Sequence, residues 1–132
     1  NVMTDLSQSL TISSDGLRLQ SQRLRHVSEN VANADTPGYQ RKLLSVKTTP
    51  FSLSDTQGPQ AGRVILDQTP VQEIYDPAHP LADASGHYRG SNVDLVIEIA
   101  DARAAQRAYE ANLKMFQQAR EMSGSLLELL RK

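Results

Sequence analysis

The residues that interrupt regular structure are gathered in the middle of this chain, and their distribution limits the possible folds more than any other feature. All six prolines and five of the seven glycines lie between Pro37 and Gly90, whereas the flanking segments contain no proline and one glycine each. Proline and glycine are the strongest breakers of helices and strands. The sequence therefore predicts three units: an N-terminal helical segment at 1–38, a small β and loop insert at 39–92, and a C-terminal helical segment at 93–132.

The N-terminal segment has an apolar repeat of seven residues, which is typical of a helix with a coiled-coil-like seam. One row consists of Leu10, Leu17, Leu24 and Val31, and the interleaved row consists of Leu6, Val27 and Ala34, interrupted by Ser13 and Gln20. Gly16 lies within this helix at a cost of about 1 kcal/mol relative to alanine. The helix is predicted at about 5–33, because Pro37 and Gly38 suit the central positions of a type II turn.

The C-terminal segment has more apolar residues than one partner helix can cover. Apolar residues recur at intervals of eleven, which predicts a nearly straight seam. Its members are Val93, Ala104, Met115, Leu126, Ile97, Ala108, Ala119, Leu130, Ala100, Ala111 and Met122. A second stripe near the opposite face contains Leu95, Ile99, Ala102, Tyr109, Leu113, Phe116 and Leu127. A two-helix hairpin leaves one face exposed, so this pattern predicts contacts with other chains.

The insert contains short segments with the composition of strands, at 42–46, 63–66 and 71–75. A hairpin of this size is too small to be stable alone. The predicted fold is mostly α: two long antiparallel terminal helices form a coiled-coil-like hairpin, with a small irregular or β insert between them.

Composition excludes several classes of protein. With 132 residues the chain has material for one modest core. A net charge of -1 argues against binding nucleic acid, and the absence of cysteine excludes thiolate chemistry and disulfides. The apolar runs are too short to span a membrane. The first residues lack the basic and apolar regions of a secretory signal, so any export is expected to proceed without a cleaved signal peptide.

Catalytic and metal-binding motifs are not evident in the sequence, so neither an enzyme nor a cofactor is expected. Asp76, His79, Asp83 and His87 are residue types that suit zinc. Their spacing matches no strong metal motif, however, and they lie among prolines in a turn-rich segment. Turn formation by the aspartates explains them more simply.

Two motifs resemble the terminal signatures of flagellar basal-body rod and hook proteins. The first is Asn-Val-Ala-Asn-Ala-Asp-Thr-Pro-Gly-Tyr at 30–39, and the second is Arg-Ala-Tyr-Glu-Ala-Asn at 107–112. Residues 75–83, together with 92–94, are most similar to one proximal-rod member of the family. The unbroken turn at 36–39 is more similar to a sister proximal-rod protein, but the C-terminal half favours the first of the two types.

The resemblance implies a structural subunit that polymerises helically through its terminal helices to form part of the periplasmic rod. It also implies export by the flagellar type III apparatus. The implied partners are copies of the chain, other proximal-rod proteins and the adaptor between rod and export gate, with no nucleic acid and no membrane span.

The residues predicted to contact other subunits lie in or beside the two motifs. They are Asn30, Asn33, Thr36, Pro37, Gly38, Tyr39, Arg107, Tyr109, Glu110, Asn112, Leu113 and Phe116. For Asn30 and Asn33, local capping is an equally good interpretation. Asn112 is predicted to fix register through a hydrogen bond between helices or subunits. Arg107 and Glu110 are also spaced for a simple surface ion pair.

Two other functional classes compete with a structural subunit. A helical adaptor or export-chaperone-like binding module would use the exposed stripe to hold a client in a complex of defined size. A small enzyme or metal protein would use the aspartates and histidines of the insert and would be a folded monomer.

Overall fold

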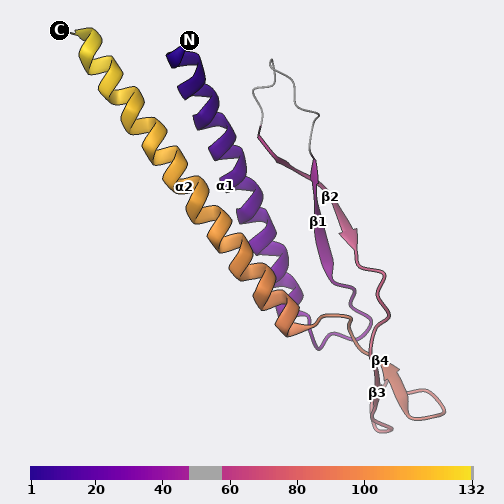
Figure 1. Ribbon diagram of the computed structural model, residues 1–132. Helices are drawn as coiled ribbons and strands as arrows, with labels where there is room; N and C mark the ends of the chain where they lie inside the picture. The colour runs from indigo at the N-terminus through magenta and orange to yellow at the C-terminus, as the bar shows by residue number, and fades with distance from the viewer. Residues whose placement is uncertain (48–57, 132) are drawn as a thin grey trace.

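A computed structural model describes residues 1–47 and 58–131. The chain begins with helix α1 (Val2–Ala32) and ends with helix α2 (Leu95–Arg131), and four short strands lie between them in the sequence. The strands are β1 (Lys42–Lys47), β2 (Gln60–Leu66), β3 (Glu73–Tyr75) and β4 (His87–Arg89). The helices lie side by side and antiparallel, so both chain ends are at the same end of the molecule (Figure 1). The predicted mostly α fold, a long helical hairpin with a small β insert, is confirmed.

The insert forms two separate antiparallel hairpins. β1 pairs with β2, placing Leu43 opposite Ile65, and β3 pairs with β4, placing Ile74 opposite Tyr88. The first hairpin lies along α1, whereas the second extends beyond the end of the helices (Figure 1). The strands predicted at 42–46 and 63–66 are confirmed and are slightly longer than expected.

The third predicted strand is shorter than expected, and its partner β4 was not predicted. Only residues 73–75 of the predicted 71–75 are in a strand, and they pair with β4. The sequence of β4 is His-Tyr-Arg, which has no alternating apolar pattern. Gly86, with a φ of 82°, forms the sharp turn that brings this polar segment back onto β3.

The contact between the helices is formed largely by small or polar residues. On α1 the buried residues are Leu6, Ser13, Gly16, Leu19, Val27 and Asn30. The buried row therefore follows the positions that Ser13 and Gln20 interrupt in the sequence, while the row of Leu10 is only partly buried and Val31 is exposed. The heptad spacing of α1 is confirmed, but its polar positions lie in the seam.

The eleven-residue seam predicted for the C-terminal helix is wrong. The buried residues of α2 are Glu98, Ala105 and Ala119, at multiples of seven, with Asn112 partly buried between them. By contrast, Met115 and Met122 are each 52% exposed. At Gly16 the Asn112 side chain fills the space beside the glycine: a Cβ atom there would lie 2.4 Å from Oδ1 of Asn112. The large apolar residues that are buried belong to α1, namely Leu6, Leu19 and Val27, whereas those of α2 lie mostly outside the seam.

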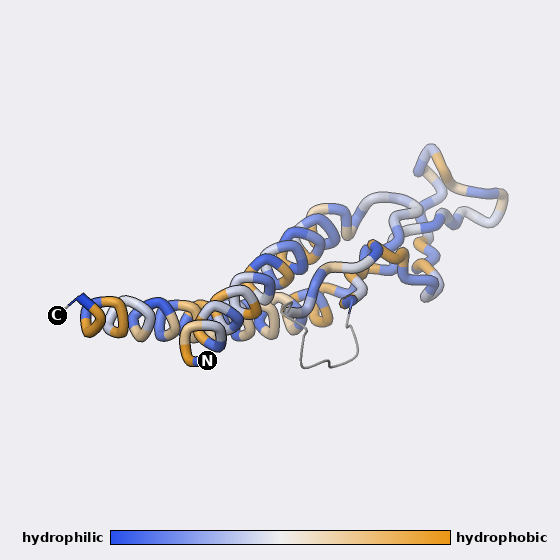
Figure 2. The backbone as a smooth tube through the Cα atoms, turned by 90° about the horizontal axis from the view of Figure 1, so that it is seen from above, coloured by the Kyte–Doolittle hydropathy of each residue, from blue (hydrophilic) through white to orange (hydrophobic). Residues whose placement is uncertain are grey.

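An exposed apolar face therefore runs along α2, as the sequence predicted. It includes Leu95, Ile99 and Leu127, each about half exposed, and Val96, which is 75% exposed. Hydrophobic residues continue to the C-terminal end of the helix (Figure 2). Neither helix in the described part of the chain combines the length and hydropathy needed to cross a membrane.

Candidate assembly surface and its polar joint

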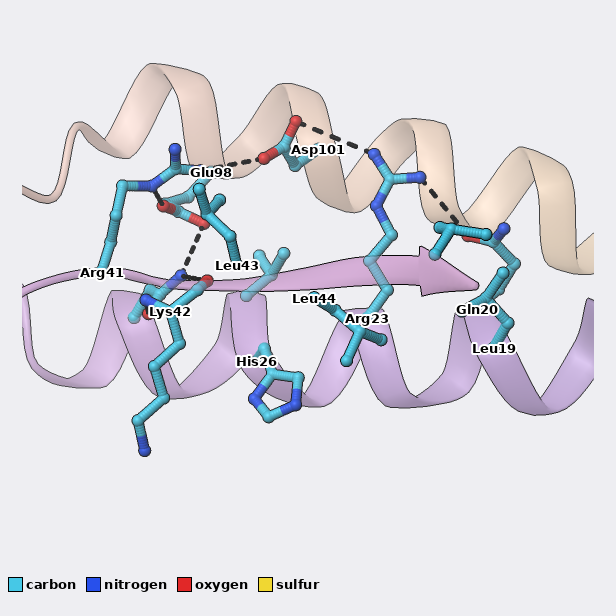
Figure 3. A pocket seen from close by; sticks show the side chains of 13 residues that line it. Leu19, Gln20, Arg23, His26, Arg41, Lys42, Leu43, Leu44, Glu98 and Asp101 are labelled. Atoms are coloured by element: carbon cyan, nitrogen blue, oxygen red, sulfur yellow. Dashed lines mark hydrogen bonds and ion pairs between the residues drawn. The ribbon is translucent and has the colours of Figure 1, made fainter. Parts of the chain in front are cut away.

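A cluster of polar side chains joins both helices to the insert at the end of the molecule away from the termini. We call it the polar joint, and it comprises Asn30, Arg41, Asp67, Asn92, Glu98 and Asp101. The Arg41 guanidinium lies at its centre, with Nε 2.6 Å from Oε1 of Glu98, Nη2 3.0 Å from Oδ2 of Asp101 and Nη1 3.3 Å from Oδ2 of Asp67. The pairs with α2 are visible in Figure 3. Because Glu98 is fully buried, its charge depends on these partners.

Asn30 connects α1 to the same joint and uses every hydrogen-bonding position of its amide. Its Oδ1 accepts hydrogen bonds from the Tyr39 hydroxyl and the Lys42 backbone N–H, both at 2.8 Å. Its Nδ2 donates to the Lys42 carbonyl at 3.0 Å and to Glu98 Oε2 at 3.3 Å. Asn30 is 1% exposed. These bonds are not those of a local cap: they hold α1, β1 and α2 together. A contact of Asn30 with another subunit stays a prediction.

The motif turn at 36–39 attaches the second hairpin to the end of α1. Tyr39 N–H bonds to the Thr36 carbonyl and Gly38 has a φ of 73°, which confirms the predicted type II turn around Pro37. The Gly38 N–H donates to the carbonyls of Arg89 and Gly90 at 3.1 and 3.0 Å. The turn therefore fixes the end of β4 through its backbone.

Asn33 has the local role that was one of the two interpretations of the sequence. It ends α1 as the C-cap, and its Nδ2 donates to the Glu29 carbonyl at 2.9 Å. Its Oδ1 accepts a hydrogen bond from the Thr36 hydroxyl at 3.0 Å. A contact of Thr36 or Pro37 with another subunit stays a prediction, and both residues are exposed.

Asn92 completes the joint between the insert and α2. Its Oδ1 accepts a hydrogen bond from the Arg41 backbone N–H at 2.7 Å, and its Nδ2 donates to the carbonyls of Asp67 and Thr69, both at 2.9 Å. Sequence reasoning did not identify Arg41, Asn92 or Glu98 as joint residues. The sequence feature that could have indicated the joint is Glu98, a single carboxylate within the apolar run at 95–100.

Charge interactions at the joint shift several pKa values. Partial burial disfavours the Arg41 cation, but the hydrogen bond and charge of Glu98, with Asp67 and Asp101, outweigh it and raise the pKa of Arg41. The hydrogen bond from Lys42 lowers the pKa of Glu29. For Asp67, hydrogen bonds from Thr69 and then Arg41 lower the pKa. These groups are therefore ionised at neutral pH and act as charged structural contacts.

The aspartates and histidines of the insert form turns. Asp83 Oδ1 accepts hydrogen bonds from Ser85 N–H at 2.9 Å and His87 N–H at 3.0 Å. The ring of His79 stacks on Tyr88 with centroids 3.8 Å apart. Within residues 1–47 and 58–131, no group of three His, Cys, Asp or Glu side chains is arranged to hold a metal ion.

The second motif lies on the long exposed part of α2. Arg107, Tyr109, Glu110 and Leu113 are exposed, and Phe116 is partly exposed. Among the described residues, no ion pair joins Arg107 to Glu110. A contact of these residues with other subunits stays a prediction.

Asn112 lies at the helix seam but does not hydrogen-bond across it in the described part of the chain. Its Nδ2 donates to the Ala108 carbonyl at 2.8 Å, within α2. Its side chain instead occupies the space that the missing Cβ of Gly16 leaves. Register between the helices therefore depends on this fit of shapes. An intersubunit hydrogen bond from Asn112 stays a prediction.

Comparison with known proteins agrees with this architecture. Residues 10–40 match the family described as "Flagella basal body rod protein", and residues 84–129 match the family described as "Flagellar basal body rod FlgEFG protein C-terminal". The first region contains Asn30 and the second contains Asn92 and Glu98, so both sides of the polar joint are included.

Full-length relatives give the same result. The flagellar basal-body rod protein FlgC of Agrobacterium fabrum is 38% identical over 136 residues, covering 98% of each chain. The proteins of the same name from Escherichia coli O6:H1 and Salmonella typhimurium are 33% and 32% identical over 124 residues, covering 89% of this chain and 92% of theirs. The chain therefore belongs to the flagellar basal-body rod protein FlgC family.

Proposed function

We propose that this chain is a structural subunit of the flagellar basal-body rod, in its proximal part, and that it polymerises helically through its terminal helices. The exposed apolar face of α2 is the observation that carries this proposal. Val96, Ile99 and Leu130 are between 52% and 75% exposed on a helix whose opposite face is already covered by α1. Burying such a face against other chains is favourable at roughly 25 cal/mol per Å².

The polar joint gives this subunit a defined shape for assembly. Arg41 and Asn30 connect the insert to both helices, so the first hairpin and the helical hairpin form one unit. A helical lattice repeats the same contacts in every subunit, and repetition requires that each subunit presents its surfaces in the same relative positions. We infer that the joint is structural and that the chain performs no catalysis and carries no cofactor.

The family supports a proposal for the location and partners of the chain. The relatives carry the name of basal-body rod proteins. We propose that this chain lies in the periplasmic rod and leaves the cytoplasm through the flagellar type III apparatus without a cleaved signal peptide. Its neighbours would be copies of itself, other proximal-rod proteins and the adaptor to the export gate. The motif residues Thr36, Pro37, Arg107, Tyr109 and Glu110 remain proposed contacts.

Sedimentation velocity combined with circular dichroism, from micromolar to near-millimolar protein, tests this function. We expect helicity to rise together with growing, heterogeneous assemblies, because the exposed face of α2 needs partners. Val96→Lys and Ile99→Lys should shift assembly to higher concentration, whereas Gln106→Lys, at an exposed polar position of the same helix, should not. A compact monomer at all concentrations would contradict polymerisation, and a saturable complex with one client would favour a helical adaptor or export chaperone.

A further inference from the structure

The outer face of α2 contains a shallow groove near its N-terminal end. The groove has a volume of about 370 Å³ and is lined by Val96, Ile99, Ala100, Arg103, Ala104 and Arg107. These positions follow the i, i+3, i+4, i+7 spacing of one helix face. At about 100° per residue that face is opposite Glu98 and Ala105, which are buried against α1. The groove therefore lies where α1 cannot cover it.

Two of the lining residues are arginines, and they give this groove a positive charge that no ion pair in the described part of the chain neutralises. Arg103 and Arg107 are exposed and four residues apart, so their like charges repel each other on the helix surface. Neither side chain forms an ion pair or hydrogen bond with another residue of 1–47 or 58–131. An apolar groove with two unpaired cations suits an apolar segment that carries carboxylates.

The C-terminal part of the same helix has the complementary composition. Glu121, Met122, Ser125, Glu128 and Leu129 lie on the same outward face, at i, i+1, i+4, i+7 and i+8. Met122 and Leu129 are exposed. Glu121 and Glu128 have no ion pair within the described residues. We call residues 121–129 the acidic segment.

We propose that the groove of one chain binds the acidic segment of a second copy, with Arg103 and Arg107 facing Glu121 and Glu128 of that copy. The inference rests on the proposed function and names the contact through which copies associate. The centres of the two surfaces are about 23 residues apart, so parallel α2 helices would be displaced by roughly 35 Å along their axes. The groove and the acidic segment are different surfaces, so this contact is heterologous. An assembly built from it has a free groove at one end and a free acidic segment at the other, so further copies can add.

Charge reversal on each surface tests this contact in the full-length chain. One variant, Arg103→Glu with Arg107→Glu, makes both surfaces acidic. The other, Glu121→Arg with Glu128→Arg, makes both basic. We expect each variant alone to self-associate at least about tenfold more weakly than the unmodified chain, because like charges then meet. An equal mixture should restore assembly, since each groove finds an oppositely charged segment.

Controls separate this contact from the fold and from the wider function. Circular dichroism should show unchanged helicity in the dilute variants, because all four positions are exposed. The chain carrying all four reversals should assemble like the unmodified one. Raised salt should weaken the unmodified contact, as it does for exposed charges.

Several outcomes would overturn the contact. Unchanged assembly of both variants, failure of the mixture to recover, or a discrete closed dimer in place of open-ended assemblies would each do so. Incorporation into basal bodies in cells is a separate readout. If both single-surface variants are incorporated normally, this contact is wrong while the rod function stands, whereas an unmodified chain that never enters the basal body would refute the function itself.

Discussion

At the scale of single residues, the family motif around 30–39 mainly organises the subunit itself. Asn30 satisfies both protons and both lone pairs of its amide within the chain, and Gly38 binds the backbone at the end of β4. Arg41, two residues after the motif, lies between three carboxylates. The sequence identified the motif residues, with capping and subunit contact as equal interpretations for Asn30 and Asn33, but it did not indicate their partners within the chain because several of these are distant in the sequence.

Replacing Arg41 by methionine should destabilise the chain by about 3 kcal/mol, because Glu98 would keep a buried charge without its main partner. Urea unfolding monitored by circular dichroism measures this loss at a fixed protein concentration. The double variant Arg41→Met with Glu98→Leu should lose less, since no buried charge remains. Equal losses in the single and double variants would show that the loss does not come from an unpaired Glu98 charge.

Acid should weaken the polar joint and the neighbouring ion pair of Glu29 with Lys42 before it affects the helices. The pKa values of Glu29 and Asp67 are lowered in the folded chain, from ordinary values of 4.5 and 3.8. A carboxyl group whose pKa is lower in the folded chain stabilises the fold at pH values above its ordinary pKa. This stabilisation is lost as the pH falls through the pKa of the folded chain. The urea midpoint should therefore fall as the pH drops below about 4.5.

The variant Glu29→Gln is the control for this pH dependence. It removes the titrating carboxylate that pairs with Lys42, so its urea midpoint should decline less steeply in acid. A slope identical to that of the unmodified chain would show that the Glu29 carboxylate is not responsible. The helices, whose seam consists mostly of uncharged groups, should lose helicity only at lower pH.

At the scale of elements, the seam between the two helices shows which sequence patterns were misleading. The apolar residues at intervals of eleven include the large side chains of α2, but the buried residues of α2 are Glu98, Ala105 and Ala119, with Asn112 partly buried beside Gly16. The large apolar residues buried in this hairpin, Leu6, Leu19 and Val27, all belong to α1. A count of large apolar residues therefore does not identify the face of α2 that meets its partner.

Adding one methyl group to either mid-helix glycine should have opposite effects. Gly16→Ala should destabilise the chain by roughly 1–3 kcal/mol, because its Cβ would overlap the Asn112 side chain and force it out of its present position. Gly124→Ala should stabilise it by roughly 0.5–1 kcal/mol, because no atom lies within 4 Å of that Cβ and alanine favours the helix. Thermal unfolding at equal concentration compares the two.

A third variant, Asn112→Ala, tests whether the Gly16→Ala effect comes from the contact with Asn112. Combined with Gly16→Ala it should recover most of the lost stability, since the smaller side chain leaves room for the new methyl group. If Gly16→Ala alone is as stable as the unmodified chain, the close packing of Gly16 against Asn112 does not determine the helix spacing.

At the scale of the whole molecule, structural support is concentrated at one end. The polar joint and the second hairpin lie where α1 ends and α2 begins, and the first hairpin runs back along α1 as far as Gly58, whose N–H donates to Asp15 at 3.1 Å (Figure 1). Nearer the termini, the described contacts between elements are those of one helix packed on the other. The exposed Leu127, Leu129 and Leu130 lie at that less supported end. The stability of α2 should therefore decrease along its length until other copies cover it.

Hydrogen exchange should reveal this gradient. In dilute protein, backbone amides at 119–131 should exchange faster than those at 98–112, because local opening is easiest where few contacts are buried. In the assembled protein the difference should shrink, since the C-terminal part of α2 then has partners. Uniform protection along α2 in the dilute chain would contradict the idea that assembly completes its packing.

The sequence alone determined the features that depend on local chemistry. The breakers set the limits of both helices to within a few residues, the Pro37-Gly38 turn was predicted correctly, and the excess of apolar residues indicated a face that one helix cannot cover. These follow from backbone preferences and periodicity, which act over a few residues. Two terminal motifs in the right order were sufficient to indicate the family.

Only the tertiary structure decided which of those residues meet. Arg41 and Glu98 are 57 positions apart, and Gly16 and Asn112 lie on different helices. A buried ion pair and a close helix contact both depend on distances that the folded backbone creates, so no local pattern predicts them. The exposed face of α2 was likewise decided by the folded structure: α2 turns Glu98, Ala105 and Ala119 toward α1, and most of its large apolar side chains remain outside for other chains to cover.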